Sequence, residues 1–295
     1  MRIKRKDFLK SLGLGAVGTL AGGGLKQSLG SHLLTDSVET GTISKRKLGK
    51  NGLEASVLCL GAGSRFTNEN FLPAQEREEY LFYAFDKGVN YLDTARNYGP
   101  SEQILGEILS ADDWDRLVLS SKTNSSTREG IMEDFKTSRK ALKRDYFDVY
   151  LVHNSALAST LDGNVEAFET LLELREQGAV GNIGFSSHGA VSHDLAIALV
   201  DRFDLDHLVL SVCSDFEDFR PIISDVRALG ATASAIKVAR IFEGQWPEGS
   251  AREAYKEVLD RQFTSGIISH SNEGIGDRGW KKVLDENLET ARAFG

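Results

Sequence analysis

The sequence predicts a parallel (β/α)8 barrel, and three observations support this class. Short β-branched apolar segments alternate with longer segments of helical period from about residue 42 onward. Strands that alternate with helices pair in parallel through right-handed crossovers. Eight such units in roughly 250 residues match the size of this barrel. The predicted strands span residues 57–61, 89–93, 117–121, 147–152, 180–186, 207–212, 231–238 and 266–271.

Amphipathic segments separate the predicted strands. Their apolar residues recur at three- and four-residue spacing, as expected for helices that pack on a sheet. Several of them end in glycine, which readily adopts the left-handed conformation that closes a helix. The expected helices are AQEREEYLFYAFDKG, SEQILGEILSA, REGIMEDFKTSRKALKRD, NVEAFETLLELREQG, DLAIALVDRFD and RPIISDVRALG.

A short hairpin is expected before the first strand, because Asn51-Gly52 in RKLGKNGLEAS is a typical hairpin turn. An open doubly wound sheet is the main alternative to the barrel. That fold usually marks its first strand-to-helix turn with a phosphate loop of three glycines. The segment LCLGAGSRFTNENF has Gly-Ala-Gly without the third glycine and without a helix start directly after it, which favours the barrel.

The composition indicates a globular chain with a full core. The 295 residues are 41% hydrophobic and 26% charged, which suits one large domain or two small ones. Acidic residues number 43 against 35 basic ones, giving a net charge of −8, and no basic stripe with interleaved aromatic residues appears. Nucleic acid is therefore not an expected partner.

The first forty residues differ from the rest. MRIKRKDFLK is basic and leads into the apolar, glycine-rich SLGLGAVGTLAGGG, which is short for a bilayer span. KRKDFLK resembles the twin-arginine export signal, with Arg5 and Lys6 at the paired positions, so that the second arginine is replaced. We expect an export signal or flexible segment over residues 1–40 and the barrel over residues 41–295.

This N-terminal pattern predicts an exported or periplasmic protein that uses the twin-arginine machinery, with a mature start between residues 22 and 42. No stable membrane span is expected in the mature form. The alternative is a cytoplasmic chain with a basic N-terminal arm. The two cysteines, Cys59 and Cys213, lie in separate apolar segments, so we expect buried thiols rather than a disulfide.

Four polar residues lie at or just beyond successive predicted strands. Asp93 ends the second strand, Lys122 follows the third and His153 follows the fourth, while Tyr98 lies in the loop after Asp93. Because every strand of a parallel barrel delivers its last residue to one rim, these side chains are expected to converge. Each alone has an ordinary structural explanation: a solvated lysine, a capping histidine or a packed tyrosine.

The chemistry of the four residues interlocks. A tyrosine hydroxyl, with a pKa of about 10, is a poor proton donor at neutral pH, and a neighbouring lysine is expected to lower that pKa. Asp93 would hold Lys122 charged and in place, while His153 would orient a substrate carbonyl oxygen toward Tyr98. Together these side chains would protonate the oxygen of a carbonyl group while a second reactant attacks its carbon.

Several segments resemble the aldo-keto reductase family: KRKLGKNGLEASVLCLG, GVNYLDTARNYGPSEQILGEIL, LVLSSKT, YFDVYLVHN and VGNIGFSSHG. The resemblance covers most of residues 43–190. The family's tetrad of Asp, Tyr, Lys and His falls on Asp93, Tyr98, Lys122 and His153. The resemblance implies a (β/α)8 barrel that reduces an aldehyde or ketone with NAD(P)H, with Tyr98 as general acid.

The resemblance also implies cofactor contacts. Ser186 and Ser187 stand where the family has a Ser-Asn pair at the nicotinamide; capping of a helix near Val191 is the alternative. Cations near residue 278 favour NADP(H) over NAD(H), although a basic helix face explains them equally. For Phe216 the alternative to cofactor contact is a packing role, and for Lys237 it is a solvated side chain. The expected contacts are Gly63, Ser64, Asp93, Ser186, Ser187, Phe216, Lys237, Ser271, Asn272, Arg278 and Asn287.

Two other functions are alternatives to the reductase. A non-catalytic nucleotide-binding sensor or subunit on the same barrel is favoured by the altered Ser-Ser pair and the irregular C-terminal segment, and opposed by the intact tetrad. A metal-dependent hydrolase needs several histidine and carboxylate ligands at strand ends, where only Asp93 and His153 qualify, so no metal is expected. The physiological carbonyl substrate is not specified by the sequence.

Overall fold

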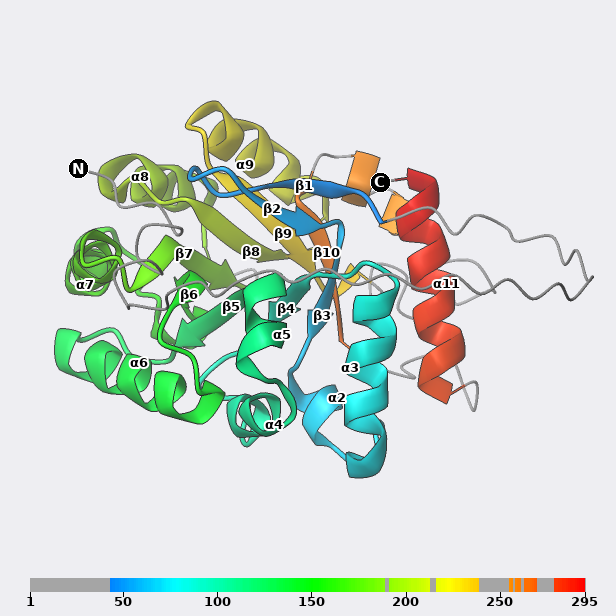
Figure 1. Cartoon of the computed structure of the whole chain (residues 1–295). Helices are drawn as coiled ribbons and strands as arrows, with labels where there is room; N and C mark the ends of the chain where they lie inside the picture. Colours follow the sequence, from blue (N-terminus) through cyan, green and yellow to red (C-terminus); the bar gives the residue numbers. More distant parts are fainter. Residues whose placement is uncertain are drawn as a thin grey trace, which may run out of the picture. The chain divides into compact units, whose positions relative to one another are not determined.

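A closed eight-stranded parallel barrel forms the centre of the described chain, in the order β10-β3-β4-β5-β6-β7-β8-β9 (Figure 1). The computed structural model describes residues 43–188, 191–212, 216–238, 255–256, 258–260, 263–269 and 279–294. The predicted fold class is confirmed. The barrel strands are β3 (Leu58–Gly61), β4 (Tyr91–Asp93), β5 (Val118–Thr123), β6 (Phe147–Val152), β7 (Val180–Ser187), β8 (His207–Ser211), β9 (Thr232–Ile236) and β10 (Ser265–Ser269).

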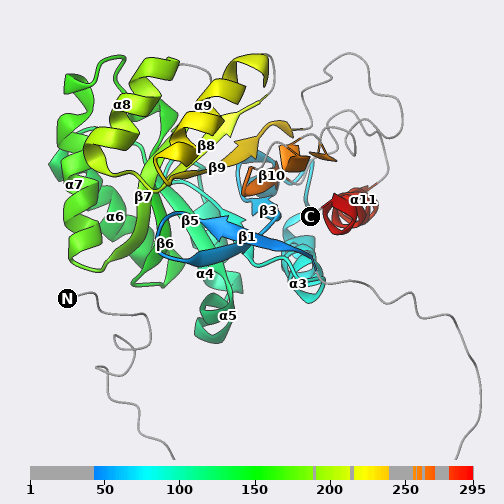
Figure 2. The ribbon, with the colours of Figure 1, turned by 90° about the horizontal axis from the view of Figure 1, so that it is seen from above.

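The expected hairpin precedes the barrel. Strands β1 (Lys45–Leu48) and β2 (Leu53–Ser56) pair antiparallel (Figure 2), and the connecting turn contains Gly49 and Gly52 at φ +71° and +82°. Only glycine adopts these left-handed angles without strain. The turn contacts the start of β9, where the Gly49 amide donates to Thr232 Oγ1 over 2.7 Å. The hairpin therefore lies at the end of the barrel where the strands begin, called here the amino face.

Helices surround the strands on the outside (Figures 1 and 2). Their apolar sides pack on the barrel and form the larger of two hydrophobic clusters. The elements are α2 (Ser64–Thr67), η1 (Ala74–Glu76), α3 (Arg77–Asp86), α4 (Ser101–Ile108), α5 (Ala111–Arg116), α6 (Arg128–Leu142), η2 (Asn154–Ala156), η3 (Asp162–Asn164), α7 (Val165–Glu176), α8 (His193–Phe203), α9 (Phe216–Ala228) and α11 (Gly279–Phe294).

Helix ends follow local chemistry. Gly88, Gly178 and Gly230 have positive φ just beyond α3, α7 and α9, as predicted for glycine-closed helices. The ends of α6 and α8 differ, because Lys143 and Asp204 take the left-handed position at φ 51° and 47°. A residue other than glycine that adopts the left-handed conformation is strained by about 1–2 kcal/mol.

Several predicted strand boundaries were off by one or two residues. Strand β4 begins at Tyr91 rather than residue 89. The Asn90 amide donates to Ser56 Oγ over 3.1 Å, and the Asn90 side chain accepts from the Ser56 amide over 2.7 Å. Strand β5 extends to Thr123, whose pairing with Val152 continues the ladder. Lys122 thus lies within β5 rather than after it.

A smaller hydrophobic cluster fills the barrel interior and includes Cys59, Tyr91, Leu151 and Val209. Cys59 is fully buried, as expected for a hydrophobic thiol, and burial raises its pKa well above the ordinary value. Cys213 lies outside the described residues. No helix in the described ranges is both long enough and apolar enough to traverse a bilayer.

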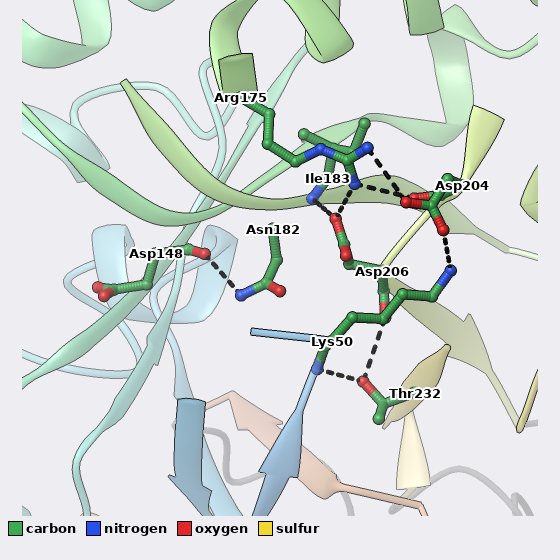
Figure 3. Close-up of polar contacts among 9 residues, drawn as sticks. Lys50, Asp148, Arg175, Asn182, Ile183, Asp204, Asp206 and Thr232 are labelled. Atoms are coloured by element: carbon green, nitrogen blue, oxygen red, sulfur yellow. Dashed lines mark hydrogen bonds and ion pairs between the residues drawn. The ribbon is translucent and has the colours of Figure 1, made fainter. Parts of the chain in front are cut away.

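Two buried carboxylates organise the amino face (Figure 3). Asp206 Oδ2 accepts from the Ile183 amide over 3.0 Å and from Arg175 Nη1 over 2.7 Å. Asp148 Oδ2 similarly accepts from the Leu119 amide and from Arg144 Nη2, over 2.9 and 2.8 Å. Each carboxylate joins two neighbouring strands and one arginine, so both stabilise the barrel.

Candidate active site

Three of the four predicted catalytic residues come from adjacent strands. Asp93 ends β4, Lys122 is the penultimate residue of β5, and His153 directly follows β6. The order β4-β5-β6 brings their side chains to the end of the barrel where the strands finish, called here the mouth. All three are buried, with exposed fractions of 3%, 1% and 6%.

Lys122 and Asp93 form a close buried ion pair. The Nζ of Lys122 lies 2.7 Å from both carboxylate oxygens of Asp93 and donates to the Thr94 carbonyl over 2.8 Å. Burial alone would lower the pKa of Lys122, but the charges of Asp93 and Tyr98 raise it above its ordinary value. Lys122 is therefore a fixed cation, as predicted.

Tyr98 reaches the mouth from the turn between β4 and α4. Its amide donates to the Ala95 carbonyl, its carbonyl accepts from the Ser101 amide, and Gly99 supplies a left-handed residue at φ +57°. The Lys122 Nζ lies 5.2 Å from the centre of the Tyr98 ring. The turn thus places the phenol beside the ion pair.

The expected net fall in the pKa of Tyr98 was wrong. Burial of the phenol is the largest influence and raises its pKa above 10, although Lys122 acts in the opposite direction. Tyr98 is therefore protonated at neutral pH and can donate that proton. Lys122 then stabilises the phenolate that remains.

Ser101 does not cap α4, contrary to what its position after Gly-Pro suggests. It is the first helical residue, and Pro100 precedes it without a side-chain cap. The Ser101 hydroxyl instead donates to the Ala62 carbonyl over 2.5 Å and lies 2.8 Å from the Thr94 hydroxyl. These bonds hold the start of α4 against the end of β3.

A partly buried ion pair behind the Tyr98 turn was not anticipated. Arg96 Nη1 bonds to Glu102 Oε2, and Ser121 donates to the other oxygen of that carboxylate over 2.7 Å. The Arg96 amide also donates to the Lys122 carbonyl over 3.0 Å. Opposite charges on either side of Gly99-Pro100 were the available sequence signal. This pair fixes the turn to β5, next to Lys122.

The rings of His153 and Tyr98 are in T-shaped contact. The ring centroids lie 5.6 Å apart at an interplanar angle of 81°. Burial, and then the charge of Lys122, lower the pKa of His153 to about 3. His153 is therefore neutral at physiological pH, and its buried Nδ1 has no hydrogen-bond partner within the described part of the chain.

The end of β7 adds polar groups to the mouth. Ser186 and Ser187 are buried within the strand, and the cap of α8 is Ser192, whose hydroxyl accepts from the Leu195 amide. The capping alternative for the two serines was therefore wrong. The Ser186 Oγ is buried without a partner among the residues described.

His188, unassigned from the sequence, lies beside this group. Its ring centroid is 6.2 Å from that of His153, and its amide donates to Asn154 Oδ1 over 2.9 Å. Its side chain keeps solvent contact, yet partial burial and the charge of Lys237 lower its pKa to about 4. The mouth thus contains two neutral imidazoles near unpartnered donors and acceptors.

The other expected cofactor residues are spread along the chain. Gly63 borders Tyr98, because a Cβ there would lie 3.6 Å from Tyr98 Cε2, and the exposed Ser64 follows it in α2. Lys237 follows β9 at φ +57°, close enough to His188 to depress the pKa of that histidine.

Asn287 is buried in α11. Phe216 begins α9, while Ser271, Asn272 and Arg278 lie outside the described residues.

The arrangement suits proton transfer to a small polar molecule. It combines a protonated phenol, a fixed cation and a neutral imidazole. Two buried polar atoms without partners, His153 Nδ1 and Ser186 Oγ, fit a bound group that can donate and accept hydrogen bonds, such as the carboxamide of a nicotinamide. Among the described residues, no three histidine, cysteine or acidic side chains are grouped to hold a metal ion.

Comparison with known proteins decides the family. The model of the aldo/keto reductase family matches residues 57–215, more than half of the chain. The chain belongs to the aldo/keto reductase family. The uncharacterized oxidoreductase YqkF of Bacillus subtilis is 33% identical over 157 residues, which are 48% of either chain. A probable voltage-gated potassium channel subunit beta of Arabidopsis thaliana is 26% identical over 269 residues, covering 82% of this chain and 78% of its own.

Solved aldo-keto reductases share the fold. A putative aldo-keto reductase from Pseudomonas aeruginosa superimposes with a TM-score of 0.71 at 23% identity, covering 88% of this chain and all of its own. An aldo-keto reductase of Bombyx mori, solved in complex with NADP, gives a TM-score of 0.61 at 17% identity over 85% of this chain and 93% of its own. Family membership and the oxidoreductase relative support the predicted oxidoreductase class.

Proposed function

We propose that this aldo/keto reductase is an enzyme that reduces an aldehyde or ketone to an alcohol with NADP(H) or NAD(H). The observation that carries the proposal is the Lys122–Asp93 pair, which lies beside the Tyr98 ring at the barrel mouth. His153 packs against the same ring. The NADP bound to the Bombyx mori relative supports NADP(H) as the cofactor.

Tyr98 is the general acid in this mechanism. Its raised pKa keeps the phenol protonated, and the substrate oxygen takes that proton as negative charge develops on it. Lys122, held by Asp93, stabilises the resulting phenolate. His153 is neutral, so it donates one N–H to the carbonyl oxygen and orients it without competing for the proton.

When bound, the nicotinamide cofactor supplies the hydride. Ser186 would hold its carboxamide, because the buried Oγ needs a partner that the described residues do not provide. Lys237 would contribute positive charge toward the cofactor phosphates. Gly63 leaves space beside Tyr98 into which a larger side chain would project.

A cofactor-oxidation assay tests the proposal. The purified protein is titrated with NADPH and NADH by nucleotide fluorescence, and then assayed against aldehydes, ketones and keto-sugars. Tyr98→Phe is expected to bind the nucleotide normally while turnover falls about 10²- to 10⁴-fold, the usual contribution of a general acid. Tyr83→Phe, which alters an exposed phenol bonded to Asp285, serves as the matched control. Full turnover by Tyr98→Phe would overturn the assignment.

A second candidate is a non-catalytic nucleotide-binding subunit. It is favoured by the match to the Arabidopsis thaliana channel subunit, which extends over most of both chains. The same titration separates the two functions. Tight NADPH binding with no oxidation of the bound nucleotide by any carbonyl in the panel would support the subunit.

We also propose that the protein is exported and acts in the periplasm. The basic segment KRKDFLK, followed by an apolar glycine-rich stretch, supports use of the twin-arginine machinery. A fusion of residues 1–42 to a reporter that is active only after folded export provides the test. Replacement of Arg5 and Lys6 by Gln is expected to retain the reporter in the cytoplasm, and unchanged export by that variant would exclude this route.

A further inference from the structure

A cavity of about 470 Å³ opens at the amino face, at the opposite end of the barrel from Tyr98. It lies between the hairpin and the starts of β9 and β10. Its lining contains three cations and two threonines, and no carboxylate: Arg46, Lys47, Gly49, Arg227, Gly230, Ala231, Thr232 and Thr264. The cavity thus brings together three basic side chains in a chain with a net charge of −8.

Arg46 is held in place by backbone oxygens. Its Nη1 donates to the carbonyls of Leu259 and Phe263 over 2.8 and 2.9 Å. The guanidinium is therefore fixed in position, while its Nε and Nη2 bond to none of the described residues. A fixed guanidinium with open donors is well suited to bind an oxyanion, since little side-chain freedom remains to be lost on binding.

Arg46 and Arg227 repel each other at this cavity. Burial lowers the pKa of Arg46, and the charge of Arg227 lowers it further. Asp260 opposes this effect to a smaller degree but does not line the cavity. An anion between Arg46 and Arg227 would therefore relieve the repulsion between two guanidinium groups.

We propose that this cavity is a binding site for a phosphate-bearing small molecule, separate from the mouth. Arg46 and Arg227 bind the phosphate oxygens, with Lys47 adding charge. The volume exceeds that of an orthophosphate ion, so either an inorganic polyphosphate or an organic phosphate ester can be its source. Thr232 connects the site to the barrel interior, since its hydroxyl lies 2.8 Å from His207 Nδ1.

Calorimetric titration with inorganic pyrophosphate tests the site. Arg227→Gln and the double variant Lys47→Gln/Arg227→Gln alter exposed residues, so both are expected to fold. We expect one pyrophosphate per chain in the wild type, and affinity at least about ten-fold lower in Arg227→Gln, because charge-assisted hydrogen bonds are lost. Lys45→Gln removes an equal charge from β1 outside the cavity and should leave affinity unchanged.

The controls separate this site from the mouth. Lys237→Gln should not change pyrophosphate binding. Loss of binding in Lys237→Gln, an equal loss in Lys45→Gln, or full affinity in the double variant would each overturn the proposal. Titration with glucose 6-phosphate and with AMP then distinguishes the sources, since tighter binding of an ester indicates an organic ligand, and tighter binding of pyrophosphate an inorganic one.

Discussion

The two ends of the barrel both contain buried ion pairs, but the carboxylates differ in their other partners. At the amino face, Asp206 and Asp148 each accept from a strand amide as well as from an arginine. At the mouth, both oxygens of Asp93 accept from Lys122. A carboxylate that accepts hydrogen bonds from strand amides stabilises the fold, whereas one that accepts only from a lysine keeps that lysine charged. We therefore expect replacements at the two ends to change different properties.

Lys122→Met should give the largest effect. It leaves the Asp93 carboxylate buried without its cation, so the free energy of unfolding should fall by about 3–5 kcal/mol, and turnover should fall because the Tyr98 phenolate loses its counter-charge. Chemical denaturation and NADPH oxidation measure the two effects. Adding Asp93→Asn should restore most of the stability without restoring turnover. Recovery of both properties would mean that the pair is structural, like those of the amino face.

Asp206→Ala tests the opposite end. It removes the acceptor for the buried Ile183 amide and for Arg175, so the free energy of unfolding should fall by about 2–4 kcal/mol. Turnover per folded molecule should stay unchanged, because Asp206 lies far along the barrel from Tyr98. Asp204→Asn is the matched control, since its side chain is 70% exposed and should contribute less than about 1 kcal/mol. A loss of turnover without a loss of stability in Asp206→Ala would contradict the expected difference between the two ends of the barrel.

The mouth was more predictable from the sequence than the amino face. Asp93, Lys122 and His153 lie at strand ends, and the rule that parallel strands finish at one rim is enough to bring them together. Asp206 and Arg175 lie 31 positions apart, and no local periodicity relates them. Their pairing depends on how α7 and β8 pack, which a pattern of apolar residues does not specify.

Ser101 illustrates the same limit. Ser101 after Gly99-Pro100 has the local pattern of a helix cap, whereas its actual acceptor is the Ala62 carbonyl, 39 residues away. The local sequence predicts only the hydrogen bonds that a side chain can form with nearby backbone groups. The sign of the pKa shift of Tyr98 was also missed, because the extent of burial in the assembled barrel outweighs the charge of Lys122.

Gly49→Ala should destabilise the hairpin against the barrel. A Cβ at this position would lie 2.0 Å from Asn182 Oδ1, and the residue has a left-handed φ of +71°. Gly52→Ala is the control, since it has φ +82° but nothing within 4 Å of its Cβ, so it should cost only the conformational strain of about 1–2 kcal/mol. Thermal unfolding should show a larger loss for Gly49→Ala, and equal losses would indicate that the hairpin moves freely over the amino face.

The smallest expected effect concerns His207, which lies inside the barrel between the two ends. Burial, and then the charge of Lys122, lower its pKa to about 3, and its Nδ1 contacts Thr232 at the amino face. In the unfolded chain its pKa returns to about 6.5. Between these values the unfolded state binds one more proton than the folded state. This histidine therefore lowers stability as pH falls from about 6.5 toward 3, by at most about 1.4 kcal/mol per pH unit.

His207→Gln should remove that dependence while keeping the one due to His153, whose pKa is also about 3. The measurement is urea unfolding at pH 7.0 and 5.5, where the variant should lose about 1 kcal/mol less than the wild type. His193→Gln is the control of opposite sign. A hydrogen bond to Asp225 raises the pKa of His193, so that residue adds stability at low pH and loses it as pH rises. Identical pH dependence in wild type and His207→Gln would mean that the folded barrel protonates this imidazole, and that its interior is less separated from solvent than burial of His207 implies.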